Sequence, residues 1–300
     1  MKTIKKSLLI LSIIATSIPS LYTDAQEVKT ISSTPLKLTY YNSAESTFGV
    51  TSILVTGQKE AILIDAQFTL PDAEKVAVMI KNSGKKLKAI FISYGDPDYY
   101  FGLEAIKKYY PNVPVYATAP TIEHIKATYV GKLEYWGKIL KQAAPKKVII
   151  PDAFTGNSLE LDGNKLEIIK VPGAPVRSFV WIPSVKAVVG GINVFGDDFH
   201  LWMADDATAP KRALWIDALN KIISLNPKVV IPGHFGNKAD LTITSVKYTE
   251  TYLHTYEQLL KTNKNSKSLI AALKAKYPNA GFLTGLELGA KVNTGEMEWK

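Results

Sequence analysis

Residues 93–102 read Ser-Tyr-Gly-Asp-Pro-Asp-Tyr-Tyr-Phe-Gly, and they follow the apolar run Ala-Ile-Phe-Ile at residues 89–92. A short apolar run bounded by turn residues predicts a buried strand. The Asp-Pro pair predicts a turn directly after that strand. Polar side chains on a loop at the end of a buried strand are typical of a functional site. Asp96 and Asp98 are the two carboxylates of this loop.

Strands and helices alternate on both sides of this loop. The apolar pattern predicts strands at residues 36–41, 49–55, 61–65, 88–93, 115–117, 147–150, 165–171, 178–182, 187–190 and 229–232. Helices are predicted at residues 71–82, 100–109, 120–130, 133–142, 210–225, 240–261 and 266–277. The same order of strands and strand–helix–strand units occurs twice. This repetition predicts an α/β protein with two sheets packed face to face and helices outside.

Motifs at residues 61–65, 93–102, 172–178, 188–191 and 231–234 resemble, in this order, those of the metallo-β-lactamase superfamily. The metal loop of that family reads His-x-His-x-Asp-His-x-x-Gly after a buried strand. In the present loop Asp98 and Gly102 match the pattern. Tyr94, Asp96 and Tyr99 stand where the three histidines would be. The resemblance implies the family's four-layer αβ/βα sandwich.

The other motifs contain further departures from the family pattern. The resemblance implies that Asp65, at the end of the first motif, braces the metal loop. Ala174 stands where a histidine ligand would be, and Gly191 stands where a metal-bridging Asp would be. His234 keeps the final histidine position. The family's usual two-metal site therefore cannot form, and zinc β-lactamase activity is not expected.

A smaller metal site is implied instead, because the resemblance brings Asp96, Asp98 and His234 together. Two carboxylates and one imidazole suit a single zinc, iron or manganese ion. His200, in an Asp-rich segment at residues 193–206, is a candidate replacement ligand or general base. Asp98, His234 and His200 are thus the candidate catalytic residues. The alternatives are that Asp98 caps a helix, that Asp96 shapes a turn, and that no metal is bound.

Aromatic side chains and one arginine predict a small-molecule pocket near the loop. The aromatic candidates are Tyr94, Tyr99, Trp136 and Trp202, which suit an apolar or ring-containing ligand. Arg177, one of two arginines in the chain, is a candidate receptor for a carboxylate or phosphate. Core packing is the alternative for the aromatic residues, and a salt bridge is the alternative for Arg177.

Composition narrows the class of protein. The 300 residues have a net charge of +9, carried by scattered lysines, and no cysteine. Such a surface argues against a nucleic-acid partner, and disulfides and thiolate ligands are excluded. Residues 1–25 read as a signal peptide. We therefore expect a periplasmic or secreted protein without stable membrane insertion after cleavage. Residues 26–300 are expected to form one domain, with C-terminal helices from about residue 240.

These observations are compatible with two functions. One is an exported hydrolase with an atypical metal site, whose metal-bound water attacks an ester, lactone, amide or phosphoester. The other is a metal-free pseudoenzyme that binds a small aromatic or anionic ligand, since a fold does not by itself imply a function. Both take a small molecule as the partner. The sequence does not indicate the oligomeric state.

Overall fold

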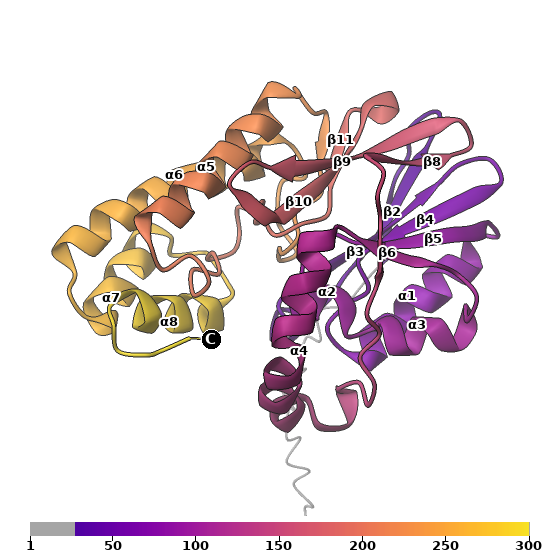
Figure 1. The fold of residues 1–300 in the computed structure, drawn as a ribbon. Coiled ribbons are helices and arrows are strands. Elements are labelled where there is room, and N and C mark those ends of the chain that lie inside the picture. The colour runs from indigo at the N-terminus through magenta and orange to yellow at the C-terminus, as the bar shows by residue number, and fades with distance from the viewer. Residues whose placement is uncertain (1–27, 300) are drawn as a thin grey trace, which may run out of the picture.

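The computed structural model describes residues 28–299, and its first sheet has seven strands in the order β1-β2-β3-β4-β5-β6-β7 (Figure 1). These strands are β1 (Val28–Ile31), β2 (Lys37–Asn42), β3 (Thr51–Thr56), β4 (Glu60–Ile64), β5 (Lys86–Ile92), β6 (Val115–Ala117) and β7 (Asp152–Ala153). Pairing is antiparallel from β1 to β4 and parallel from β4 to β7. The loops that follow the parallel strands therefore meet at one edge, where α/β sheets place their ligands.

The second sheet has five strands in the order β12-β11-β10-β9-β8. They are β8 (Ser158–Leu161), β9 (Asn164–Val171), β10 (Ala174–Ile182), β11 (Ala187–Val189) and β12 (Val229–Val230). All neighbours pair antiparallel except β11 and β12, which are parallel. The register of β10 against β9 shifts between Ala174 and Ser178. This irregularity falls in one of the motifs singled out above.

The two sheets pack through their apolar faces. Ile53, Ile64 and Phe91 from the first sheet form one cluster with Val180 and Val189 from the second, and all five are fully buried. Contacts with β2 and β3 place α1 (Leu70–Asn82) against the first sheet, with α3 (Leu103–Tyr109) beside it. Contacts with β9 and β10 place α5 (Ala209–Ser224) against the second. The chain is therefore the four-layer αβ/βα sandwich that the sequence predicted.

Helix α1 shows how local sequence sets these elements. The Thr69 side chain accepts a hydrogen bond from the Asp72 backbone N–H at 3.2 Å, and a proline stands in the first turn. Ala73, Val76 and Ile80 are buried, as their spacing along one face predicts. The helix therefore lies within one residue of the predicted 71–82.

Four predicted elements differ in the structure. The helices expected at 120–130 and 133–142 are one helix, α4 (Ala119–Leu140), because Gly131 faces open space and does not interrupt it. The helix expected at 100–109 is divided into α2 (Pro97–Tyr100) and α3, because Gly102 lies so close to Ala66 that a Cβ there would meet its carbonyl oxygen at 1.9 Å. Residues 147–150, expected as a strand, join neither sheet.

The last part of the chain is helical. Helices α6 (Ile243–Thr262), α7 (Ser266–Lys276) and α8 (Leu283–Asn293) lie next to one another at one end of the molecule (Figure 1). Helix α8 was not predicted, and neither were β1 and β8. Short 3₁₀ turns occur at Glu45–Thr47, Lys141–Ala143 and Pro183–Val185. Within residues 28–299, no helix has the length and apolar character needed to cross a membrane. The expected signal peptide at residues 1–25 lies outside the described residues.

Candidate functional site

The loop at residues 93–102 follows β5 and is held in place by a buried carboxylate. Asp65, directly after β4, accepts hydrogen bonds from the Ser93 backbone N–H at 2.8 Å and from the Ser93 hydroxyl at 2.5 Å. The Ser93 hydroxyl oxygen accepts in turn from the Gly191 N–H at 2.6 Å. Burial raises the pKa of Asp65 to about 7, although the Ser93 donors oppose this shift. Asp65 thus connects three of the motifs at one sheet edge.

Asp98 and His234 meet as the sequence predicted. His234 Nε2 lies 3.2 Å from a carboxylate oxygen of Asp98 and 3.0 Å from the Tyr99 hydroxyl. Its Nδ1 lies 3.0 Å from the Phe48 carbonyl oxygen. Because a carbonyl only accepts, Nδ1 carries a proton. Nε2 is then the atom that accepts from Tyr99 when the ring is neutral, or donates to Asp98 when the ring is charged.

Asp96 has a partner that sequence reasoning missed. The ammonium group of Lys132, on α4, forms a buried ion pair with Asp96. His124 Nε2 lies 3.7 Å from the same carboxylate oxygen. Burial alone would raise the pKa of Asp96, but Lys132 and His124 lower it well below its usual range. Burial alone would lower the pKa of Lys132, but its carboxylate neighbours, Asp96 first, raise it.

One sequence signal pointed to Lys132. Ile125, Tyr129, Lys132 and Trp136 follow one another at spacings of four, three and four residues along α4. This spacing puts them on one face of a helix. Ile125 and Trp136 on that face are buried. A lysine on such a face needs a buried acidic partner, because an unpaired charge is costly in the interior.

The predicted metal ligands do not fit a metal ion. Asp96 is engaged by Lys132, while Asp98 and His234 are engaged with each other. In the part of the chain that the structure describes, no group of three or more His, Cys, Asp or Glu side chains is arranged to hold a metal. The ammonium group of Lys132 supplies a positive charge among these carboxylates. The expectation that Asp96, Asp98 and His234 form one ligand set was therefore wrong.

The glycine at the family's metal-bridging Asp position is fixed by packing. Gly191 has a φ of +76°, and a Cβ there would lie 2.1 Å from the Ser178 carbonyl oxygen. No side chain fits without a shift of the backbone, so a carboxylate has no room at this position. Ala174, which stands at a histidine position of the family, lines an open groove described below.

A small inner cavity of about 30 Å³ lies over the Asp98–His234 pair. This volume is enough for about one or two water molecules. The cavity is lined by aromatic residues (Phe48, Phe68, Trp136, Trp202, Phe282, Trp299), by Pro97 and Ile192, and by polar residues (Asp96, Asp98, Lys132, Asp205, His234). Two of the aromatic residues predicted to bind a ligand, Trp136 and Trp202, are thus placed in its wall.

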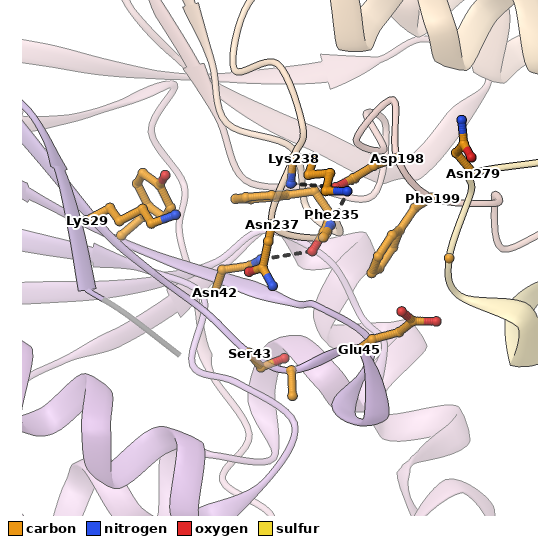
Figure 2. Close-up of a pocket in the computed structure, with 14 residues that line it drawn as sticks. Lys29, Asn42, Ser43, Glu45, Asp198, Phe199, Phe235, Asn237, Lys238 and Asn279 are labelled. Carbon is orange, nitrogen blue, oxygen red and sulfur yellow. Dashed lines mark hydrogen bonds between the residues drawn. The ribbon is translucent and has the colours of Figure 1, made fainter. Parts of the chain in front are cut away.

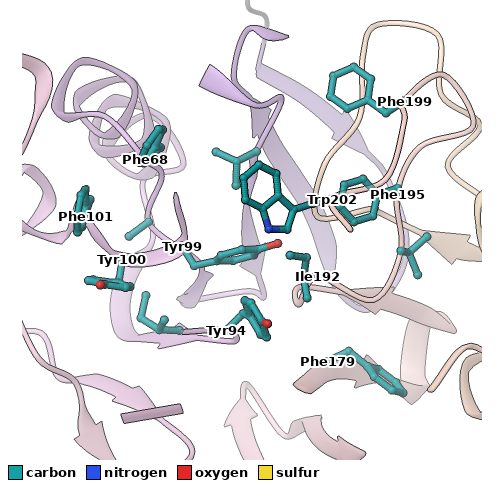
Figure 3. Packing of buried hydrophobic residues seen from close by; sticks show 14 of the residues in the cluster. Phe68, Tyr94, Tyr99, Tyr100, Phe101, Phe179, Ile192, Phe195, Phe199 and Trp202 are labelled. Atoms are coloured by element: carbon teal, nitrogen blue, oxygen red, sulfur yellow. The ribbon is translucent and has the colours of Figure 1, made fainter. Parts of the chain in front are cut away.

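An outer groove of about 460 Å³ lies on the other side of the loop. Tyr94 lines this groove, whereas Tyr99 is fully buried and lines neither space. The rings of Tyr94 and Tyr99 meet edge to face, with centroids 5.6 Å apart (Figure 3). Burial raises the pKa of both hydroxyls well above 10. Tyr99 therefore serves to hold His234 and is not placed to touch a ligand.

Arg177 is committed to groups of its own chain. Its guanidinium donates to Asp206 at 2.6 Å and to Asn193 at 3.4 Å, and it lies over the Trp215 ring at 4.4 Å. The residue is 4% exposed. A buried arginine with a carboxylate and an aromatic face already in contact is not an available receptor for an anion. The structure therefore shows Arg177 in the salt bridge that was the alternative, and does not leave it free to receive a carboxylate or phosphate.

His200 lies among the C-terminal helices and lines neither the inner cavity nor the outer groove. Its Nδ1 is 2.9 Å from the Tyr252 hydroxyl, and its ring packs edge-on against Tyr277. Burial, and then the charge of Lys274, lowers the pKa of His200 to about 4. The structure does not bring His200 to Asp98 and His234, so its expected part in the site is corrected. Its ring is a neutral packing element.

A polar cavity of about 420 Å³ lies elsewhere (Figure 2). Several of the polar side chains that line it form hydrogen bonds to the backbone of neighbouring loops. Asp198 accepts from the backbone N–H groups of Gly236 and Lys238, each at 2.9 Å, and Asn42 donates to the Phe235 carbonyl at 2.8 Å. None of the predicted site residues lines this cavity. We therefore regard the inner cavity and the outer groove as the candidate site.

Comparisons with known proteins agree with the fold described above. The metallo-beta-lactamase from Pontibacter korlensis has a similar structure, with a TM-score of 0.51 and 18% identity over 76% of this chain and 99% of that chain. A metallo-beta-lactamase from Hirschia baltica gives a TM-score of 0.52 and 16% identity over 75% and 97%. These likenesses show the fold alone. The model of the metallo-beta-lactamase superfamily matches residues 46–234, more than half of the chain. The chain therefore belongs to the metallo-beta-lactamase superfamily.

Proposed function

We propose that this chain is a metal-independent binding protein for a small molecule, a member of the superfamily that has kept the fold and replaced the metal. One observation carries the proposal. The buried ammonium group of Lys132 neutralises Asp96, so the carboxylate that would otherwise demand a cation already has one. Asp98 and His234 satisfy each other in the same cavity. The arrangement is complete without a metal ion.

The surroundings of these two polar pairs support ligand binding. Six aromatic side chains line the inner cavity, and ligand sites are commonly apolar with a few fixed polar groups. The adjoining groove of about 460 Å³ is large enough for a small organic molecule. The proposal therefore places the ligand across the groove and the cavity, and includes export to the periplasm or the medium. N-terminal sequencing of the mature protein tests cleavage after residue 25.

The decisive test of metal independence is elemental analysis of the mature protein, purified without a His tag or a chelator. We expect no stoichiometric zinc, iron or manganese, and no gain in thermal stability when these ions are added. One equivalent of metal that disappears in Asp98→Ala and His234→Ala variants would overturn the proposal. A thermal-shift screen of small molecules on the same preparation then searches for the ligand.

A hydrolase is the second candidate, favoured by the Asp98–His234 pair beside a water-sized cavity. In this scheme Nε2 of His234 takes a proton from water, and Asp98 stabilises the imidazolium that forms. The hydroxide attacks the carbon or phosphorus of an ester, lactone, amide or phosphoester, while Lys132 stabilises the negative charge that forms; the bond to the alcohol or amine then breaks, and the leaving group takes the proton from His234. The His234→Ala variant should then lose all turnover of a generic ester. Unchanged turnover in that variant would remove this candidate.

A further inference from the structure

The inner cavity and the outer groove are neighbours that share part of their lining. Among the residues that line them, Asp205 and Trp299 are the two that they share. The cavity measures about 30 Å³ and the groove about 460 Å³. A side chain that stands between two such spaces decides whether they form one site. Trp299 and Asp205 are therefore the residues that lie between the groove and the cavity that contains His234.

Trp299 occupies a slot built for a flat ring that carries an N–H group. Its indole N–H donates to Asp205 at 3.0 Å. Its ring meets Trp202 edge to face at 5.5 Å and Tyr135 at 5.8 Å. Edge-to-face aromatic pairs at these distances are favourable. The slot thus offers aromatic walls and one acceptor, which are the features of a binding site for an aromatic ligand.

Asp205 differs from the other carboxylates around these spaces. Asp96 pairs with Lys132, Asp98 with His234, and Asp206 with Arg177. Within residues 28–299, the hydrogen bonds to the Asp205 carboxylate come from two neutral indole N–H groups, of Trp202 at 2.5 Å and Trp299 at 3.0 Å. Burial, and then the charge of Asp96, raises the pKa of Asp205 to about 6, although the charge of Lys132 opposes this shift. A cationic donor would satisfy this carboxylate better than an indole does.

The segment that carries Trp299 is anchored short of the slot. Helix α8 ends at Asn293, and the Glu296 carboxylate accepts from the Ser266 backbone N–H and hydroxyl, each at 2.6 Å. Trp299 lies three residues beyond this anchor and is partly exposed. Its departure from the slot would break one hydrogen bond and two ring contacts while the anchor stays in place. Displacement by a ligand therefore requires only a local change.

We propose that the ligand of this site is an aromatic amine, whose ring takes the place of Trp299 against Trp202 and Tyr135 and whose cationic nitrogen binds Asp205. The inference rests on the proposed function and names the ligand class for it. A cation fits because the lining carries four carboxylates, while its buried cations Lys132 and Arg177 are already paired and the ammonium group of Lys211 donates to the Asp205 backbone carbonyl at 2.9 Å. Trp299 holds the slot when the ligand is absent and yields it when the ligand binds.

The test compares wild type with Trp299→Ala by isothermal titration calorimetry, with tryptamine as the probe. Removing the internal competitor should tighten binding about tenfold or more, the worth of one good polar contact. In the Trp299→Ala background, Asp205→Asn should cancel the gain because it removes the charge. No gain in Trp299→Ala overturns the inference. Equal binding of 3-indolepropionate, which has the same ring but a carboxylate, also overturns it.

Matched variants separate the slot from general effects. Trp299→Phe keeps the ring and loses the N–H, so we expect affinity between that of wild type and Trp299→Ala. Tyr109→Ala removes an exposed aromatic side chain remote from both spaces and should leave binding unchanged. Circular dichroism confirms that each variant is folded. A failure of tryptamine to bind leaves metal independence standing, because elemental analysis tests that separately.

Discussion

Replacing Lys132 by Met should destabilise the protein more than any surface substitution. The Lys132 and Asp96 side chains are 11% and 10% exposed and form an ion pair. Met fills much of the volume of Lys but leaves the carboxylate of Asp96 without its ammonium partner. Breaking one side of a buried pair costs about 3–5 kcal/mol. We expect a loss of this size in the free energy of unfolding at pH 7.

The pH dependence of this loss identifies its cause. In wild type the folded-state pKa of Asp96 is lowered, so the pair contributes stability above the unfolded pKa of about 4, and that contribution is lost as the pH falls through the folded value. Without Lys132, burial raises the pKa of Asp96, so the carboxylate can take up a proton as the pH falls. The difference between Lys132→Met and wild type should therefore shrink between pH 7 and pH 4.

The assay is urea unfolding followed by circular dichroism at several pH values, with midpoint and m-value both fitted. Lys138→Met is the matched control, because Lys138 lies on the same helix with 77% of its side chain exposed. It should change stability by less than about 0.5 kcal/mol. The Asp96→Asn, Lys132→Met double variant should recover part of the loss. A Lys132→Met loss no larger than that of the control would refute the reasoning.

Further predictions concern residues that support the site. The native state disfavours the proton that unfolded His200 binds, so the stability of wild type relative to His200→Gln should fall by roughly 3 kcal/mol between pH 6.5 and pH 4, as measured by urea titrations of both proteins. Gly191→Ala should lower the melting temperature sharply, since its Cβ would lie 2.1 Å from the Ser178 carbonyl oxygen. Tyr99→Phe should cost about 1–2 kcal/mol in urea, because His234 loses a buried hydrogen-bond partner.

The fold was largely predictable because apolar spacing repeats along each element. Ala73, Val76, Ala77 and Ile80 share one face of α1, and all four are buried. Differences arose where one glycine decides the path. Gly131 lies in open space and leaves α4 continuous, while Gly102 is pressed against the chain and ends α2. Both positions are glycine, and only the atoms packed around each one distinguish them.

The site was predictable only in part, because a loop motif identifies one residue of each contacting pair and not its partner. Asp98 and His234 lie on motifs and were brought together as expected. Lys132 is 36 residues from Asp96, and nothing in the loop indicates which lysine reaches it. Trp299 is 94 residues from Asp205 and joins it through the packing of the C-terminal helices. Such long-range pairs depend on tertiary structure, and the helix face that Lys132 shares with Ile125 and Trp136 indicates its burial but not its partner.

Electrostatics explains how this scaffold keeps its acidic loop. A carboxylate that is buried without a cation is costly, and a bound metal is one way to supply the charge. In this chain Lys132 supplies it from α4, fixed by the fold and independent of metal in the medium. The remaining carboxylate, Asp205, meets neutral indoles and still favours a cation. In the function we propose, lysine takes the place of the metal, Asp205 is left with neutral indole donors, and the proposed cationic ligand supplies the missing charge.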